Sequence, residues 1–152
     1  MSNFDLTQLI YVSSRSEIWG NNDLLSVKKT SEQNNSKNNI TGILLSKEET
    51  FLQLLEGPKE NIHSVYASII SDKRHKNIVK LMDEPVGNRI FDGWSMAVRE
   101  VYNDHPLADT FMSFQHSIFS KNICTEGAEV ALEIVNGFRL DKAFMEVDLV
   151  RS

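Results

Sequence analysis

The sequence of 152 residues predicts an α+β fold, a ferredoxin-like sandwich with the order β-α-β-β-α-β-β followed by two helices. Two observations predict it. Runs rich in β-branched and aromatic residues alternate with runs whose apolar residues recur at helical spacing. Neither an internal repeat nor a low-complexity linker interrupts this alternation. Because strand–helix–strand units favour right-handed crossovers, we expect both helices of the sandwich on one face of the sheet.

The first half of this order consists of a strand, a helix and a hairpin. β-branched and aromatic content predicts the strands, and Asp23 supplies a cap for the helix. The polar cluster 34–39 is expected to end that helix, because short polar side chains compete for backbone hydrogen bonds. The expected elements are a strand at 6–13, a helix from 23 to about 33, and hairpin strands at 40–45 and 50–55.

A second helix and two further strands complete the sheet. The helix is expected to stop near Ser71, and the apolar runs at 78–82 and 94–98 are expected to be the fourth and fifth strands. The helix itself is predicted by apolar residues at helical spacing, namely Ile62, Val65, Tyr66, Ile69 and Ile70.

Beyond residue 102 only helices are expected, so we divide the chain into a sheet domain at 1–102 and a helical extension at 103–152. Pro106 suits the first turn of one helix. A second helix begins near Thr125 and is expected to end at the C-cap signal Asn136–Gly137. Two such amphipathic helices can cover the core or form an oligomer or partner contact. The first helix has a single apolar stripe, formed by Leu107, Phe111, Phe114 and Ile118.

Composition excludes several classes of function. A net charge of −5 and a pI near 5.4 argue against a nucleic-acid or anionic-membrane surface. Cys124 is the only cysteine, and the four histidines lack paired ligand spacing, so no metal site is expected. There is no phosphate loop or nucleophile elbow, and no apolar run approaches the roughly 18–20 residues of a membrane span. We therefore expect a soluble cytoplasmic protein that is not an enzyme.

Gln53 is the most informative residue, because its carboxamide lies in an apolar strand run. A buried amide left unpaired costs roughly 1–3 kcal/mol, so a core hydroxyl, the backbone or a ligand heterocycle must meet it. Tyr11 on the first strand can be its neighbour, because the first and third strands are adjacent in a ferredoxin-like sheet. A plain hydrogen bond between two core residues would explain this pair equally well.

Five other residues also have ordinary explanations when each is taken singly. Asn35 fits a helix C-cap, and Arg74 and His75 fit solvated residues beside a helix C-terminus. Trp94 and Met96 alternate on a strand, so they share a face and fit core residues. It is the joint arrangement of these residues with Tyr11 and Gln53 that is informative.

That arrangement closely resembles the BLUF family, blue-light sensors that hold FAD in a ferredoxin-like domain. The resemblance extends from about Leu6 to Val98, in the family order and with similar spacing. It does not cover the C-terminal third as specifically, although short family members have two helices there. Five segments account for it, at 9–13, 34–42, 51–57, 72–75 and 91–96.

The resemblance implies FAD as the cofactor and a role for each matching residue. Tyr11 and Gln53 are the implied photoactive pair, and Trp94 and Met96 respond to the rearranged glutamine. Ile78 is an alternative to Ile70 for covering the ring. The implied cofactor-binding residues are Tyr11, Val27, Ser31, Asn34, Asn35, Gln53, Ile70, Arg74 and His75.

The implied function is a blue-light photoreceptor. Excited flavin takes an electron and then a proton from tyrosine through the intervening amide, which returns rotated or tautomerised and changes the hydrogen bonds around the ring. Such a switch signals through changed protein–protein contacts, so we expect an unidentified downstream protein partner and a homo-oligomer. Two alternatives stay open, a small flavin oxidoreductase and a ferredoxin-like binding module without flavin.

Overall fold

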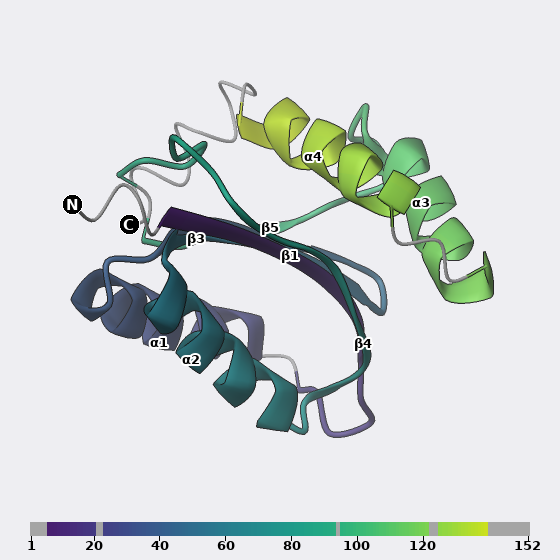
Figure 1. Ribbon diagram of the computed structural model, residues 1–152. Coiled ribbons are helices and arrows are strands. Elements are labelled where there is room, and N and C mark those ends of the chain that lie inside the picture. The colour runs from purple at the N-terminus through teal and green to yellow at the C-terminus, as the bar shows by residue number, and fades with distance from the viewer. Residues whose placement is uncertain (1–5, 21–22, 94, 122–124, 140–152) are drawn as a thin grey trace.

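A computed structural model describes residues 6–20, 23–93, 95–121 and 125–139. Its centre is a five-stranded sheet with the order β4-β1-β3-β2-β5. Helices α1 and α2 cover one face of this sheet, and α3 and α4 cover the other (Figure 1). The strands are β1 (Leu6–Arg15), β2 (Thr41–Lys47), β3 (Thr50–Pro58), β4 (His75–Pro85) and β5 (Ala97–Glu100). The helices are α1 (Asp23–Lys37), α2 (Lys59–Ser71), α3 (Ala108–Lys121) and α4 (Thr125–Arg139).

The register of the sheet places the two residues of greatest interest opposite each other. β1 pairs antiparallel with both β3 and β4, and Tyr11 is in register with Gln53. β5 joins the free edge of β2 in parallel, with Ile43 beside Ala97. The predicted α+β class, the order of elements and the adjacency of the first and third strands are confirmed.

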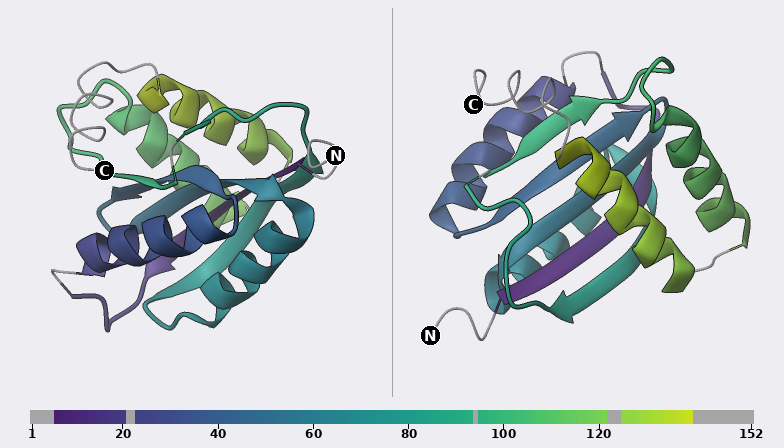
Figure 2. Two further views of the ribbon diagram at one scale, coloured as in Figure 1. Left: turned by 90° about the vertical axis from the view of Figure 1, so that its left-hand side faces the viewer. Right: turned by 90° about the horizontal axis from the view of Figure 1, so that it is seen from above.

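Side chains alternate between two hydrophobic clusters, one on each face of the sheet. Leu9, Tyr11 and Met96 belong to the cluster beneath α1 and α2. The cluster on the other face joins strand residues to α3 and α4, which bury Phe111 and Phe138 against it. Core cover is therefore one role of the two C-terminal helices (Figure 2). The side chain of Ile118, the last residue of the predicted stripe, lies outside the described residues.

Several element boundaries differ from the prediction. Helix α1 continues to Lys37 rather than ending near residue 33, and Asn39 then turns the chain with a φ of 56°. The polar cluster does not break the helix: the Asn35 side chain is buried and hydrogen-bonded, and Ser36 and Lys37 are exposed to solvent. β4 is longer at both ends than residues 78–82, and β5 begins at 97 rather than 94.

Helix α4 likewise passes through the predicted C-cap and ends at Arg139. Gly137 packs against Leu107 instead of ending the helix. A Cβ atom at this position would lie 2.4 Å from Cδ1 of Leu107, so a larger residue would require that side chain to shift. Because the helix continues, Phe138 reaches the core.

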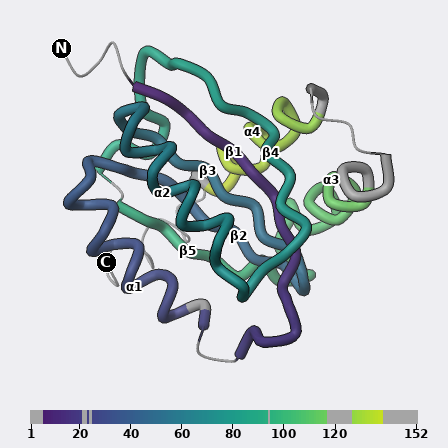
Figure 3. Tube along the Cα trace, turned by 60° about the horizontal axis from the view of Figure 1, so that its bottom comes forward, coloured from purple at the N-terminus to yellow at the C-terminus, as the bar shows by residue number. Residues whose placement is uncertain are grey.

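Helices α1 and α2 lie side by side in front of the sheet (Figure 3). α2 packs on β1 and β3, whereas α1 approaches β5. Among the described residues, no helix is long and apolar enough to cross a membrane.

Candidate functional site

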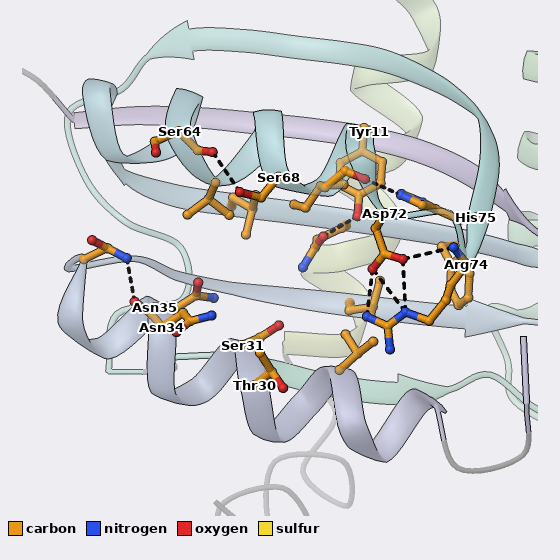
Figure 4. A pocket seen from close by; sticks show the side chains of 18 of the residues that line it. Tyr11, Thr30, Ser31, Asn34, Asn35, Ser64, Ser68, Asp72, Arg74 and His75 are labelled. Atoms are coloured by element: carbon orange, nitrogen blue, oxygen red, sulfur yellow. Dashed lines mark hydrogen bonds and ion pairs between the residues drawn. The ribbon is translucent and has the colours of Figure 1, made fainter.

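A cavity of about 310 Å³ lies between α1 and α2, with the sheet as its floor (Figure 4). This volume is within the roughly 300–1,000 Å³ typical of small-molecule sites. Leu44, Phe51 and Leu55 contribute apolar surface from the sheet. The two helices contribute side chains that are mostly small and polar, namely Val27, Thr30, Ser31, Asn34, Asn35 and Asn38 from α1, and Ser64, Val65, Ser68 and Ile69 from α2.

Tyr11 and Gln53 are joined on the floor of this cavity. The Tyr11 hydroxyl donates a hydrogen bond to Oε1 of Gln53. Nε2 of Gln53 in turn donates to Sδ of Met96, 3.5 Å away. All three side chains are buried, and Gln53 is only 4% exposed. A core hydroxyl therefore meets the carboxamide, and the chain from Tyr11 through Gln53 ends at Met96.

The protonation state of Tyr11 follows from its surroundings. Burial, assisted by nearby Tyr66 and Asp72, raises the pKa of the Tyr11 phenol well above its usual value near 10. The phenol consequently holds its proton at neutral pH and acts as the donor toward Gln53. The rings of Tyr11 and Tyr66 lie 5.7 Å apart between centroids.

His75 closes the cavity beside Tyr11 and has both ring nitrogens engaged. Nε2 lies 2.7 Å from the carbonyl oxygen of Ile69, which can only accept, so Nε2 has the proton. Nδ1 lies 2.8 Å from Oγ of Ser13 on β1. The ring meets Tyr11 edge-on, with 6.1 Å between centroids. These contacts fix the imidazole in a single orientation.

Arg74 links the C-terminal end of α2 to the N-terminal end of α1. Its Nη2 lies 2.7 Å from Oδ2 of Asp72, and its Nη1 lies 3.6 Å from Oδ1 of Asp23. The hydrogen bond from Arg74 lowers the pKa of Asp72, and the same pair raises the pKa of Arg74. The two carboxylates hold the guanidinium at the rim of the cavity.

Asn35 connects α1 to the segment that precedes β5. Its Nδ2 donates to the carbonyl oxygen of Ser95 at 3.0 Å, and its side chain is buried. Its own carbonyl accepts from the amide of Ile40. The backbone carbonyl of Asn35 thus helps to fix the chain that leaves α1, and its side chain fixes Ser95, the residue before Met96.

Most residues predicted for the site come together around this cavity. Ile70 does not, and its prediction is corrected: its side chain is 53% exposed, whereas the preceding Ile69 lines the cavity. One residue turns a helix by about 100°, so adjacent positions face different directions. Ile78 packs in the cluster that contains Tyr11. Trp94 lies outside the described residues. The predicted residues that line the cavity are Tyr11, Val27, Ser31, Asn34, Asn35, Gln53, Arg74 and His75.

Sequence reasoning missed a polar row on α2 and an aromatic wall. Ser64 and Ser68 face the cavity and are separated by four residues, a spacing that places them on one helix face. That spacing was readable, but serines on a helix usually face solvent. Trp19 follows β1 in a loop, where no periodicity reveals its direction, and it packs against Phe51 with 4.8 Å between ring centroids.

Comparison with known proteins identifies the family. Residues 6–97 match the model of the BLUF family, described as sensors of blue-light using FAD. The chain belongs to the BLUF family. It is therefore a blue-light photoreceptor that uses FAD.

Two relatives from different organisms carry the BLUF region within much longer proteins. Subunit alpha of the photoactivated adenylate cyclase of Euglena gracilis is 37% identical over 119 residues, which are 76% of this chain and 12% of that protein. The blue light- and temperature-regulated antirepressor BluF of Escherichia coli K12 is 43% identical over 83 residues, which are 51% of this chain and 19% of that protein. The chain thus spans only a small part of these relatives.

A solved BLUF structure has a similar size. The dark-state structure of the BLUF protein BlrB is 26% identical with a TM-score of 0.69, and the match covers 85% of this chain and 97% of that one.

The residues of the cavity suit FAD. The isoalloxazine of FAD has apolar faces and an edge of carbonyl and nitrogen atoms, so it requires flat apolar contacts together with amide and hydroxyl partners. Leu44 and Leu55 supply the former, while Asn34, Asn35 and Ser31 supply the latter. Within the described ranges, no cluster of three or more histidine, cysteine, aspartate or glutamate side chains is arranged to hold a metal ion.

Proposed function

We propose that Tyr11 and Gln53 are the photoactive pair of this BLUF protein and that Met96 senses their rearrangement. The observation that supports this most directly is the continuous hydrogen-bonded chain from the Tyr11 hydroxyl through the Gln53 amide to Sδ of Met96. This chain lies on the cavity floor and connects the centre of the sheet to the residue before β5. Trp94, two residues earlier, is proposed to respond with Met96.

FAD supplies the absorption of blue light and a one-electron oxidant when it is bound. With FAD bound and excited, Tyr11 would give up an electron to it, and the hydroxyl proton would move along the existing hydrogen bond to Oε1 of Gln53 while Nε2 of Gln53 gives up a proton toward the reduced ring. Both return to Tyr11 when the charge recombines, so the net reaction makes and breaks no lasting covalent bond. Gln53 is able to relay because an amide both donates and accepts. After recombination, the Gln53 amide can adopt a changed arrangement in which it no longer donates to Met96.

The other cavity residues are proposed to hold the cofactor. Asn35 and Asn34 offer amides at the α1 wall, and Ser31 and Val27 lie one and two turns earlier on the same face. Arg74 and His75 offer cationic and imidazole groups at the opposite wall. The ion pairs of Arg74 with Asp72 and Asp23 support its role at the rim, because they preorganise its guanidinium.

The output is proposed to pass through protein contacts rather than through a reaction. We assign residues 1–102 to flavin binding and 103–152 to signal output, through a downstream protein partner and a homo-oligomer in the cytoplasm. The relatives support this, because their BLUF regions accompany a cyclase in one case and an antirepressor in the other. The β2–β5 pairing supports it too, because β5 leads directly into the segment before α3.

Absorption spectroscopy tests the proposal. The FAD-loaded protein is expected to show a reversible red shift of its flavin band under blue light, followed by recovery in darkness without added substrate. Turnover of an added electron donor or acceptor with no red shift would instead establish the oxidoreductase alternative. A protein that takes up no flavin on reconstitution would contradict both.

A further inference from the structure

Glu56 lies near the end of β3 and is completely buried, with 0% of its surface exposed. Its carboxylate accepts three hydrogen bonds. The backbone amides of Ile90 and Phe91 donate at 2.8 and 2.9 Å, and Nε2 of Gln8 donates at 2.9 Å. Ile90 and Phe91 belong to the connection between β4 and β5, more than thirty residues away in the sequence. A side chain of the sheet thus holds the backbone of this connection.

The chemistry of these contacts requires an acceptor at position 56. Two of the three partners are backbone N–H groups, which can only donate, and the third donates through the amino group of an amide. A carboxylate has acceptor capacity on both oxygens. A leucine at position 56 has no acceptor, so it would leave the buried amides of Ile90 and Phe91 unpaired.

Arg89 also fixes the connection between β4 and β5 to the sheet. Its Nη1 donates to Oγ1 of Thr41 at 2.8 Å and to the backbone carbonyl of Glu56 at 3.0 Å. Its Nη2 donates to the carbonyl of Asn39 at 2.7 Å. Thr41 and Glu56 are in register on β2 and β3, so the guanidinium spans two adjacent strands. Residues 89–91 are therefore fixed to the sheet by two independent side chains.

The connection reaches both faces of the sheet. Phe91 is buried in the cluster beneath α3 and α4, whereas Met96 is buried in the cluster beneath α1 and α2. At the second face, Asn35 holds the carbonyl of Ser95 and Gln53 holds Met96. A short piece of chain is thus held by Glu56 on one face and by the photoactive glutamine on the other.

We propose that Glu56 is a positioning residue of the photoswitch. It fixes the middle of the β4–β5 connection, so that a change in the Gln53–Met96 contact moves β5 instead of being absorbed by the preceding loop. The role rests on the proposed function of Tyr11 and Gln53. It requires no contact between Glu56 and the flavin, because Glu56 and the cavity lie on opposite faces of β3.

Hydrogen exchange with FAD-loaded protein, in darkness and under blue light, tests this role, and flavin spectra of the same samples report the photochemistry. Glu56→Leu removes the acceptor and is expected to keep bound FAD and the red shift. Its Ile90 and Phe91 amides should exchange about tenfold faster in darkness. The difference between light and dark exchange at residues 97–101 should fall to about a third or less of the wild-type difference. The dark exchange of residues 86–93 is measured on the flavin-free protein as well.

Two further variants make the test decisive. Arg89→Met removes the second side chain that fixes the connection and leaves the Glu56 carboxylate in place. It should reduce the difference at 97–101 as Glu56→Leu does, and it provides the test if the Glu56→Leu chain does not fold. Val12→Ala loosens the core on β1 away from this connection and should retain the wild-type difference at 97–101. A wild-type difference in Glu56→Leu, despite released amides at 90 and 91, overturns the positioning role alone. A wild-type protein that shows no red shift overturns the proposed function, and the positioning role with it.

Discussion

The Tyr11 hydroxyl donates a hydrogen bond to Oε1 of Gln53 across two residues that are in register on β1 and β3. Neither side chain is exposed, and Gln53 uses its amide nitrogen to contact Met96 at the same time. The orientation of the carboxamide is therefore determined by a donor on one side and a soft acceptor on the other. An orientation fixed by two partners can be switched by changing either one.

Replacing Gln53 by leucine is expected to abolish the red-shifted lit state while leaving a folded, flavin-binding protein. The change removes the amide that connects Tyr11 to Met96 at nearly unchanged volume. Tyr11→Phe should behave alike, because it removes the donor hydroxyl. Difference spectra before and after blue illumination measure the effect.

Tyr66→Phe is the matched control for the loss of a phenol. Tyr66 packs near Tyr11 but makes no hydrogen bond to Gln53 among the described contacts. It should show a normal reversible red shift. If Gln53→Leu or Tyr11→Phe shows that shift as well, the assignment of the photoactive pair is wrong.

The sequence predicted the pairing of Tyr11 and Gln53 because strand neighbours depend on few variables. Once the strand order is known, the two-residue alternation decides which side chains share a face. Which face of a helix lies in the cavity was harder to predict. The rotation of α2 places Ile69 rather than Ile70 in the cavity, and this rotation depends on packing against β1 and β3 that periodicity alone does not determine.

Long-range backbone contacts were beyond prediction. The proposed role of Glu56 depends on two backbone amides that lie more than thirty residues later in the chain. The residues around Glu56 do not specify the path of the β4–β5 connection that supplies these amides. Local rules also failed where packing opposed them. The signal Asn136–Gly137 would ordinarily end a helix, but α4 continues to Arg139 and buries Phe138 in the core.

The raised pKa of Tyr11 predicts a loss of stability in alkaline solution. The folded pKa lies above the unfolded value of about 10, so the folded chain retains a proton that the unfolded chain releases. Stability contributed by this group is therefore complete below pH 10 and declines as the pH rises above it. Urea unfolding between pH 8 and 11 should show this decline.

Tyr11→Phe should make the alkaline decline less steep, because it removes the most strongly shifted phenol. Part of the decline should persist, since burial also raises the pKa of Tyr66. A Tyr11→Phe protein with the wild-type slope above pH 10 would show that other groups cause the effect.

Gly42→Ala is expected to destabilise the fold by more than roughly 2 kcal/mol. A Cβ atom at this position would lie 2.1 Å from the carbonyl oxygen of Leu54, which is backbone of the adjacent strand and cannot move aside without breaking the β2–β3 ladder. Gly87→Ala is the control, because a Cβ atom there would meet no atom beyond its chain neighbours within 4 Å. Thermal unfolding of both variants should show a large loss for the first and little change for the second.

Blue light is expected to alter hydrogen exchange more in the described residues 95–121 and 125–136 than in α2. Gln53 contacts Met96, β5 begins at the next residue, and the amide of Val101 continues the contact to β2 by donating to the carbonyl of Ser46 at 2.7 Å. The change should therefore travel along β5 toward α3, whose Phe111 and Phe114 pack on the sheet. Exchange measured in darkness and under continuous illumination provides the comparison. Exchange that is identical in darkness and in light, both in residues 60–71 and in residues 95–136, would show that the signal leaves by another face, and the route from strand to helix would have to be abandoned.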